Sequence, residues 1–154
     1  MDRTRLVGIA GELFQNHGLD VRGWRLEFKP LGHRIGWCCS RRLVIVINDY
    51  YADHNDQMLV MDTLLHEAAH AIVGPVHQHN GIWKEMALRL GCAPTACSKI
   101  DVVLRPGKWR ASCPSCALQF EKYRRPKYIA GYYCPKCGKD KGKLVFIAQV
   151  SEVA

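Results

Sequence analysis

The stretch that decides the fold runs from Thr63 to Trp83 and reads TLLHEAAHAIVGPVHQHNGIW. It contains the pattern HEAAH inside an otherwise apolar run. The apolar positions continue on both sides of this pattern and are Met58, Met61, Leu64, Leu65, Ile72 and Val73. This arrangement predicts a core helix with a single polar stripe. Gly74-Pro75 predicts that the helix ends there and that the chain turns.

His66 and His70 lie four residues apart within this predicted helix. On a helix, that separation places two side chains on one face and about one turn apart, so they can bind one ion. Imidazole nitrogens are common zinc ligands, and a carboxylate beside them can accept a proton from a water molecule at the metal. The pattern therefore predicts a catalytic zinc site in which Glu67 is the general base.

A catalytic zinc typically has three protein ligands, so a third residue must be found downstream. After the turn, His77, His79 and Glu85 are all within reach. In an extended segment, His77 and His79 would point to opposite sides, so we expect only one of them to face the metal. The residues alone do not decide which one.

A family resemblance bears on this choice. The run HEAAHAIVG, followed by His79 with Trp83 four residues later, then Lys84, Met86 and Leu90-Gly91, resembles the SprT-like zinc metalloproteases of the Spartan type. That family pairs HExxH with a later histidine four residues before an aromatic residue, which implies His79 as the third ligand. The family often has glycine directly after this histidine, whereas this chain has Asn80.

The resemblance extends from the N-terminal helix to the C-terminal region. Gly36-Trp37-Cys38 is similar to a Gly-x-Cys element of the family. Cys92 and Cys97 bracket Ala93-Pro94-Thr95-Ala96, and this stretch resembles the Gly-Cys-x-Pro segment of many members. We do not expect these two cysteines to bind zinc. The resemblance implies a small zincin-like metalloprotease domain that acts on proteins bound or crosslinked to DNA.

Four further cysteines form two CxxC pairs separated by 17 residues, which is the spacing of a zinc ribbon. They are Cys113, Cys116, Cys134 and Cys137. Each pair on a tight turn would present two thiolates to one ion, and four thiolates complete a closed structural site. A thioredoxin-type redox motif would need only one CxxC in a βαβ context. We therefore expect two zinc ions, one catalytic and one structural.

The charge is distributed unevenly along the chain. Residues 1–104 carry 11 Lys and Arg against 11 Asp and Glu, whereas residues 105–154 carry 11 against 3. The basic residues include Lys122, Arg124, Arg125 and Lys127, which are interleaved with tyrosines. Because basic groups neutralise phosphates and aromatic rings stack on bases, this pattern favours DNA as a partner. A solvated basic face on a structural ribbon is the alternative.

The predicted fold is α+β, with residues 1–104 as a SprT-like metalloprotease domain and residues 105–154 as a basic zinc ribbon. Helical spacing predicts a helix from Arg3 to Gly18. Three short strands follow, at 24–28, 33–38 and 41–47, and predict a small antiparallel sheet. The central helix is expected to start near Asp56, and a second helix to run from Gly81 to Leu90. The segment 101–107 is expected to be a linker, and the ribbon strands lie at 109–113, 118–123, 128–133 and 144–150.

Two other functions are compatible with the sequence. One is a DNA-binding zinc protein whose HExxH site is structural or inactive. The other is a metalloprotease that has protein substrates but no link to nucleic acid. No apolar run approaches the roughly 20 residues that span a bilayer, and no signal peptide is recognisable. We therefore expect no membrane partner and an intracellular, reducing location, cytoplasmic or nucleoid-associated.

Overall fold

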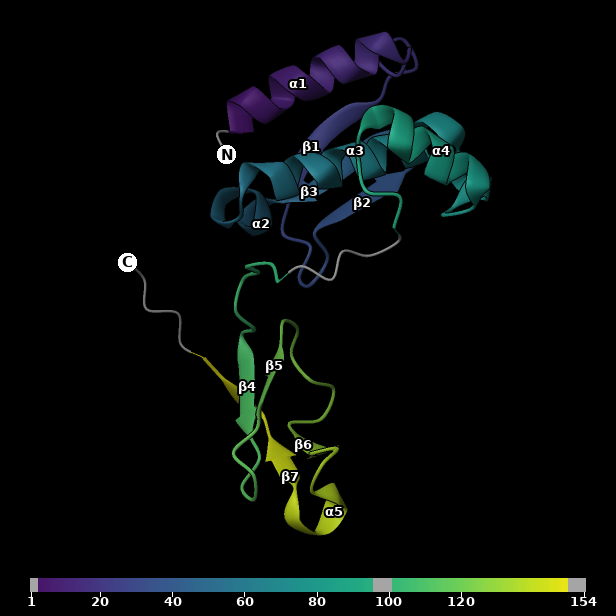
Figure 1. Ribbon diagram of the computed structural model, residues 1–154. Coiled ribbons are helices and arrows are strands. Elements are labelled where there is room, and N and C mark those ends of the chain that lie inside the picture. The colour runs from purple at the N-terminus through teal and green to yellow at the C-terminus, as the bar shows by residue number, and fades with distance from the viewer. Residues whose placement is uncertain (1–2, 96–100, 150–154) are drawn as a thin grey trace. The chain divides into compact units, whose positions relative to one another are not determined.

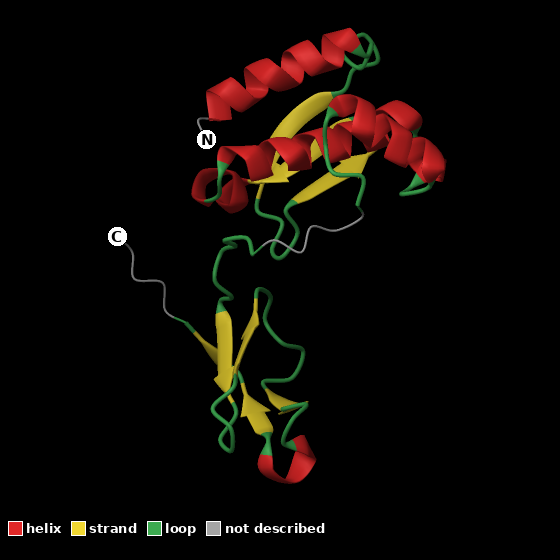
Figure 2. Cartoon of the chain, viewed as in Figure 1, coloured by secondary structure: helices red, strands yellow, loops and turns green. Residues whose placement is uncertain are grey.

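The computed structural model describes residues 3–95 and 101–149. Contacts divide the chain into two compact units, Met1–Arg105 and Pro106–Ala154. The first unit combines helices with one sheet, and the second consists mostly of short strands (Figure 2). This architecture confirms the predicted α+β class. No helix in the described part of the chain has the length and apolarity needed to cross a membrane.

In residues 3–95 and 101–105, the first unit forms three strands and four α-helices, which are labelled in Figure 1. In chain order they are α1 (Arg3–Asn16), β1 (Arg25–Lys29), β2 (Gly36–Cys39), β3 (Val44–Asn48), α2 (Asp49–His54), α3 (Gln57–Val73) and α4 (Gly81–Leu90), with a 3-10 turn, η1 (Pro75–His77), between the last two. The helix predicted from Gly81 to Leu90 is confirmed at both ends.

The sheet has the strand order β1-β3-β2 and is mixed. β2 and β3 form the expected antiparallel pair, but β1 runs parallel to β3, so the prediction of a purely antiparallel sheet is wrong for this pair. The apolar strand β3 is buried along its whole length, which favours the central position. Because β3 lies between β1 and β2, the connection after β1 crosses to the other edge of the sheet, and β1 ends up parallel to β3.

One face of this sheet forms the core together with α1 and α3. This core cluster combines buried residues of α1, β3 and α3, and Leu26 and Phe28 of β1 pack against it. The buried residues on α1, β3 and α3 are Leu6, Ala10, Phe14, Ile45, Ile47, Val60, Leu64, Ala68 and Ala71. The opposite face of β1 carries Arg25, Glu27 and Lys29, where Glu27 forms an ion pair with each of the two basic residues. Helices α1 and α3 therefore pack on the face of the sheet that carries Ile45 and Ile47.

The sequence pattern does not predict helix α2. Residues 48–55 are rich in Asn and Asp, which indicates only a cap for the central helix. In the structure the Asn48 side chain accepts hydrogen bonds from the backbone N–H groups of Tyr50 and Tyr51, which starts α2. Asp56 then accepts one from Met58 and starts α3. Two caps in succession therefore produce two helices where the sequence pattern indicates one.

The segment expected to be a linker packs partly on the first unit. Val102 and Leu104 contact its core. The Asn55 side chain exchanges two hydrogen bonds of 2.7 Å with the backbone of Val103. The Arg105 guanidinium lies over the Tyr50 ring. Residues 102–105 are therefore an integral part of the first unit.

The described residues of the second unit form two small sheets. Its elements are β4 (Trp109–Ser112), β5 (Gln119–Lys122), β6 (Ala130–Tyr133), α5 (Gly138–Lys141), β7 (Lys143–Val145) and β8 (Ile147–Ala148). β4 pairs with β5 and also with β8, while β6 pairs with β7. The hairpin pattern does not predict the pairing of β8 with β4. Two positions of the sequence predictions, Cys97 and Val150, lie outside the described residues.

Strand β2 approaches α3 very closely at Gly36. A Cβ atom at this position would lie 2.8 Å from Thr63 Cγ2 and 3.0 Å from Glu67 Oε1. Both distances are below normal van der Waals contact, and the helix side chains there are packed. Only glycine therefore lets β2 lie at this distance from the helix.

We expect Gly36→Ala to lower the free energy of unfolding by about 1–3 kcal/mol, because the added methyl group overpacks the β2–α3 interface. Urea denaturation of the wild type and the variant measures this. Gly11→Ala in α1 is the matched control: a Cβ atom at Gly11 would have no neighbour within 4 Å, so we expect stability unchanged or higher by up to about 1 kcal/mol. Equal effects of the two substitutions would contradict the close-approach argument.

Candidate metal centre

Helix α3 places the polar stripe of the HEAAH pattern against the sheet. Leu64, Ala68 and Ala69 are completely buried, so the helix is a core element, as predicted. Its C-terminus is closed by Gly74 at a φ of 89°, whose N–H donates to the carbonyl of His70. The helix therefore ends about one turn after the second histidine.

The chain then returns so that a third histidine meets the first two. The Asn80 side chain accepts hydrogen bonds from the N–H groups of Ile82 and Trp83 and starts α4. Gln78 adopts a φ of 32°, which is unusual for a residue with a side chain. This turn brings His79 back over α3, where its Nε2 lies 3.2 Å from the Nε2 atoms of both His66 and His70.

The spacing of these three nitrogens fits a zinc ion. Ligand atoms 2.0–2.1 Å from a tetrahedral zinc lie about 3.3 Å apart, close to the separations of His79 from its two neighbours. Among the described residues, His66, His70 and His79 form one of the two groups whose ligand atoms all lie within 4.8 Å of one another. Burial lowers the pKa of His66 and of His70 to about 4, so both are neutral and able to coordinate at neutral pH.

The competing ligands lie elsewhere. The Nδ1 atom of His77 faces the side-chain amide of Asn80 at 3.3 Å. Glu85 is exposed and pairs with Arg89 one turn further along α4. Neither belongs to the histidine cluster. The structure thus brings His79 to the first two histidines, the position that the family resemblance implies for it.

The ring of Trp83 packs against all three imidazole rings of the cluster. Its side chain is fully buried, and its ring centroid lies 4.5 Å from that of His79, 4.7 Å from that of His66 and 5.2 Å from that of His70. The sequence pattern does not predict this contact with all three rings. Contact with all three rings restricts their orientation, which preorganises the nitrogens for an ion.

Glu67 lies beside the cluster and is almost completely buried. Burial raises the pKa of its carboxyl group to about 7, although a hydrogen bond from the backbone N–H of Cys38 opposes this shift. A carboxyl group with a pKa near the working pH is suited to accept a proton and give it back. Strand β2 therefore both covers Glu67 and tunes its acidity.

Cys38 and Cys39 line the pocket above the histidines and are half-buried. Burial, with the nearby Glu67 carboxyl group, raises the pKa of the Cys38 thiol to about 12, so this thiol is uncharged. The sequence pattern does not predict that both cysteines border the site. Other residues missed at this border are Arg34, Ser40, Arg41 and Gln78. No local motif marks these residues, because the register of β2 on β3 is what brings the first three here.

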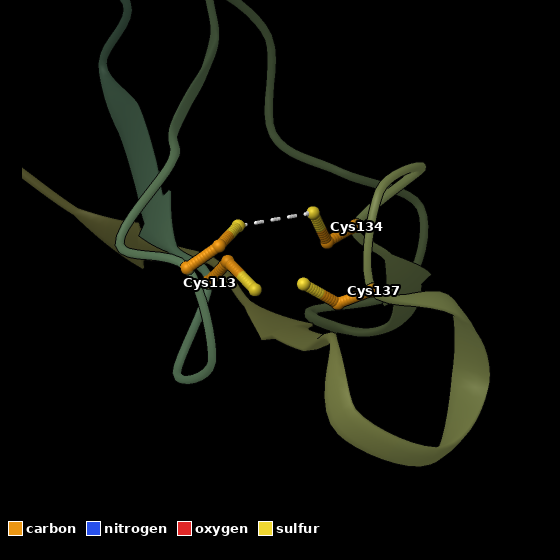
Figure 3. Close-up of side chains that lie close together, drawn as sticks. Cys113, Cys134 and Cys137 are labelled. Carbon is orange, nitrogen blue, oxygen red and sulfur yellow. Dashed lines mark hydrogen bonds between the residues drawn. The ribbon is translucent and has the colours of Figure 1, made fainter.

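The second group of candidate ligands lies in the second unit. The sulfur atoms of Cys113, Cys134 and Cys137 point toward one another (Figure 3). Together with Cys116 they form a group whose sulfur atoms all lie within 4.8 Å of one another. The Sγ atoms of Cys116 and Cys134 are 3.6 Å apart, near the separation of about 3.8 Å for two sulfurs 2.3 Å from a tetrahedral zinc. None of the four forms a disulfide.

Both knuckles have the same backbone form. The N–H groups of Ala117 and Gly138 donate to the carbonyls of Cys113 and Cys134, four residues earlier, and both donors have a positive φ. Burial opposes a charge on Cys113, but backbone N–H groups and neighbouring thiols outweigh it and lower the pKa of this thiol to about 7. The four-cysteine cluster fits a zinc ribbon.

Comparison with protein families identifies the first unit. The family model described as the SprT-like family matches residues 7–102, and the chain belongs to this family. This family is associated with metallopeptidase-type domains, which agrees with a histidine cluster beside a buried carboxyl group. No curated protein and no solved structure matches the chain.

We expect two zinc ions per chain by elemental analysis. His79→Ala should reduce the content to one, because two histidines alone hold zinc weakly, whereas His77→Ala should leave it at two. Cys113→Ser combined with Cys134→Ser should remove the other ion. If His77→Ala lost zinc and His79→Ala kept it, the proposed ligand set would be wrong.

Proposed function

We propose that this protein is a zinc-dependent metalloendopeptidase. The observation that carries the proposal is the convergence of three histidine nitrogens at zinc-ligand spacing directly beside the buried carboxyl group of Glu67. His66, His70 and His79 would hold the ion. When bound, zinc supplies a Lewis acid that lowers the pKa of a water molecule from 15.7 toward about 7 and polarises a carbonyl.

The chain's own residues supply the proton transfers. Glu67 accepts a proton from the attacking water and then delivers it to the nitrogen of the leaving amine. The hydrogen bond from the Cys38 N–H and the packing against Gly36 hold the carboxyl group in place for both steps. Trp83 keeps the three imidazoles oriented during the reaction.

A structural zinc site is less well supported by this arrangement. A structural site is closed by four protein ligands, as the cysteine cluster is. The histidine cluster has three, and it opens into a pocket that Glu67 also lines. A free coordination position beside a general base is the arrangement of a hydrolytic site rather than a structural one.

We further propose that the substrates are DNA-bound proteins and that the ribbon binds DNA. Arg124, Arg125 and Lys127 are exposed, as are the rings of Tyr128 (61%) and Tyr133 (41%). Lys122 differs from the other predicted contacts: it is half-buried, with its Nζ 3.8 Å from the centre of the Tyr132 ring. Phosphate contacts are therefore assigned chiefly to the other three basic residues, with exposed tyrosines available for stacking.

Glu67→Gln is expected to abolish cleavage of a DNA-binding protein and of the chain itself, because glutamine cannot carry the proton. Gel analysis with and without DNA checks this. Cleavage that needs both DNA and Glu67 supports the whole proposal. Cleavage that needs Glu67 but not DNA supports the peptidase alone, and cleavage by the variant equal to that of wild type contradicts it.

The stability of the same variant at two pH values tests the raised pKa of Glu67. The pKa of Glu67 is about 7 in the folded protein against 4.5 for an unperturbed carboxyl group. The folded state therefore binds this proton more tightly, and wild type loses stability as pH rises from 4.5 to 7, by up to about 3 kcal/mol. In metal-free protein, the stability of Glu67→Gln relative to wild type should thus be higher at pH 8 than at pH 5.

Replacing Arg124, Arg125 and Lys127 by glutamine should weaken DNA binding and reduce its dependence on salt. Removing three phosphate contacts should lower the slope of log affinity against log salt concentration by about two to three. Fluorescence anisotropy with a labelled oligonucleotide measures both quantities. The charge-matched control replaces the exposed Arg5, Arg22 and Arg42 of the first unit. Equal losses in the two triple variants would contradict a specific role of the ribbon.

A further inference from the structure

The pocket over the histidine cluster has two sides of different origin. It is open and measures about 670 Å³. One side comes from the helical segment and comprises His66, Glu67, His70, Pro75, Gln78 and His79; the other comes from β2 and the residues next to it. This second side covers Glu67 and donates the Cys38 N–H to its carboxyl group, but the side chains of the second side have no role in the proposed proton transfers.

Glu67 lies against the middle of β2. Its carboxyl group would be 3.0 Å from a Cβ at Gly36, and it accepts a hydrogen bond from the N–H of Cys38. Because β3 pairs with only one edge of β2, the other edge has no strand partner among the described residues. A free edge beside a reacting centre suits an extended peptide, since backbone hydrogen bonds can align it with the strand.

Arg34 and Arg41 line the pocket at the two ends of β2. Arg34 precedes Gly36 by two residues and Arg41 follows Cys38 by three, so the two arginines lie on opposite sides of Glu67 along the strand. Both are exposed, and neither forms an ion pair with any residue in the described ranges. Arg3, Arg25, Arg89, Arg105 and Arg110, by contrast, each pair with a carboxylate.

The exposed charge around the pocket is therefore entirely positive. Glu67 is the one acidic residue in its lining, and this carboxyl group is buried and used for proton transfer. The accessible charges are the two guanidinium groups, which form charge-assisted hydrogen bonds with carboxylates. A substrate with carboxylates at both ends of its bound segment would complement them, whereas lysines at these positions would be repelled.

We propose that Arg34 and Arg41 determine the specificity of the pocket by selecting extended peptide segments that carry Asp or Glu on both sides of the scissile bond. The inference rests on the proposed peptidase function and adds the substrate chemistry. Nucleic-acid phosphates could also pair with arginine. We favour a peptide because both arginines line the same pocket as Glu67 and the three histidines. The peptide bond to be cleaved has to lie in this pocket.

The experiment compares three fluorogenic peptides with the same central residues and flanks that contain Glu, Gln or Lys. The full-length zinc-loaded protein should cleave the Glu peptide with a kcat/KM roughly tenfold above that of the Gln peptide, since each exposed pair contributes a factor of about 2–5. The Lys peptide should be cleaved most slowly. Added salt should reduce the differences, because the pairs are exposed.

Replacing Arg34 and Arg41 by glutamine should bring the Glu and Gln peptides to equal rates, while Gln-peptide cleavage continues. Arg42→Gln is the matched control: its side chain is exposed but does not line the pocket, so selectivity should persist. A third variant with Arg124, Arg125 and Lys127 replaced by glutamine excludes capture of acidic peptides by the ribbon. Selectivity that follows the ribbon variant instead of the Arg34 and Arg41 variant would overturn the proposal.

Binding to the zinc-loaded Glu67→Gln protein separates this inference from the peptidase proposal. Fluorescence anisotropy should show tighter binding of the Glu peptide than of the Gln peptide, and the preference should disappear when Arg34 and Arg41 are also replaced. If no peptide is cleaved but this preference is present, the peptidase proposal fails and the selection survives. Equal cleavage and equal binding of all three peptides overturns the selection alone. Unchanged peptide preference in the Arg34 and Arg41 variant, with weakened oligonucleotide binding, assigns the arginines to nucleic acid and also overturns it.

Discussion

The first unit depends on burying a polar stripe inside an apolar core. Helix α3 cannot pack without also burying Glu67 and covering His66 and His70, and burial of unpaired polar groups is costly. Strand β2 reduces this cost by supplying an N–H for the carboxyl group, while Trp83 packs against the imidazoles and restricts their orientation. The close approach at Gly36 and the turn at Gln78 are the backbone conditions for these contacts.

The two proposed metal sites show how the same ion can be held for different purposes. The cysteine cluster is formed by two knuckles of the same backbone form, and its four sulfurs leave no position for a substrate. The histidine cluster is held from below by one large ring, and its upper side faces a pocket. Closure by four ligands therefore suits the structural role proposed for the cysteine cluster, and an open side beside a carboxyl group suits the catalytic role proposed for the histidine cluster.

The features that could be predicted from the sequence are those encoded locally. The HEAAH helix, the Gly74-Pro75 turn, the helix from Gly81 to Leu90 and the cysteine knuckles all follow from spacing within short segments. The parallel pairing of β1 with β3 depends on which strand takes the centre of the sheet, and no short pattern records this. The same is true of Arg34 and Arg41, which reach the site only through the register of β2.

The pocket is thus encoded in two separate parts of the chain. The histidine cluster and Glu67 come from the 14 consecutive residues between His66 and His79, and β2 with its flanking arginines comes from residues 34–41. Bringing the ends of so short a segment together costs little chain entropy, because most of its residues already belong to helix α3. Under the proposed function, substitutions in residues 34–41 can therefore change which substrate peptides bind, while the three histidines that would hold the metal are retained. Gly36 is the exception, because a side chain there would collide with Glu67, whereas the Cys38 N–H belongs to the backbone and is kept on substitution. New specificities would therefore arise from changes around Gly36.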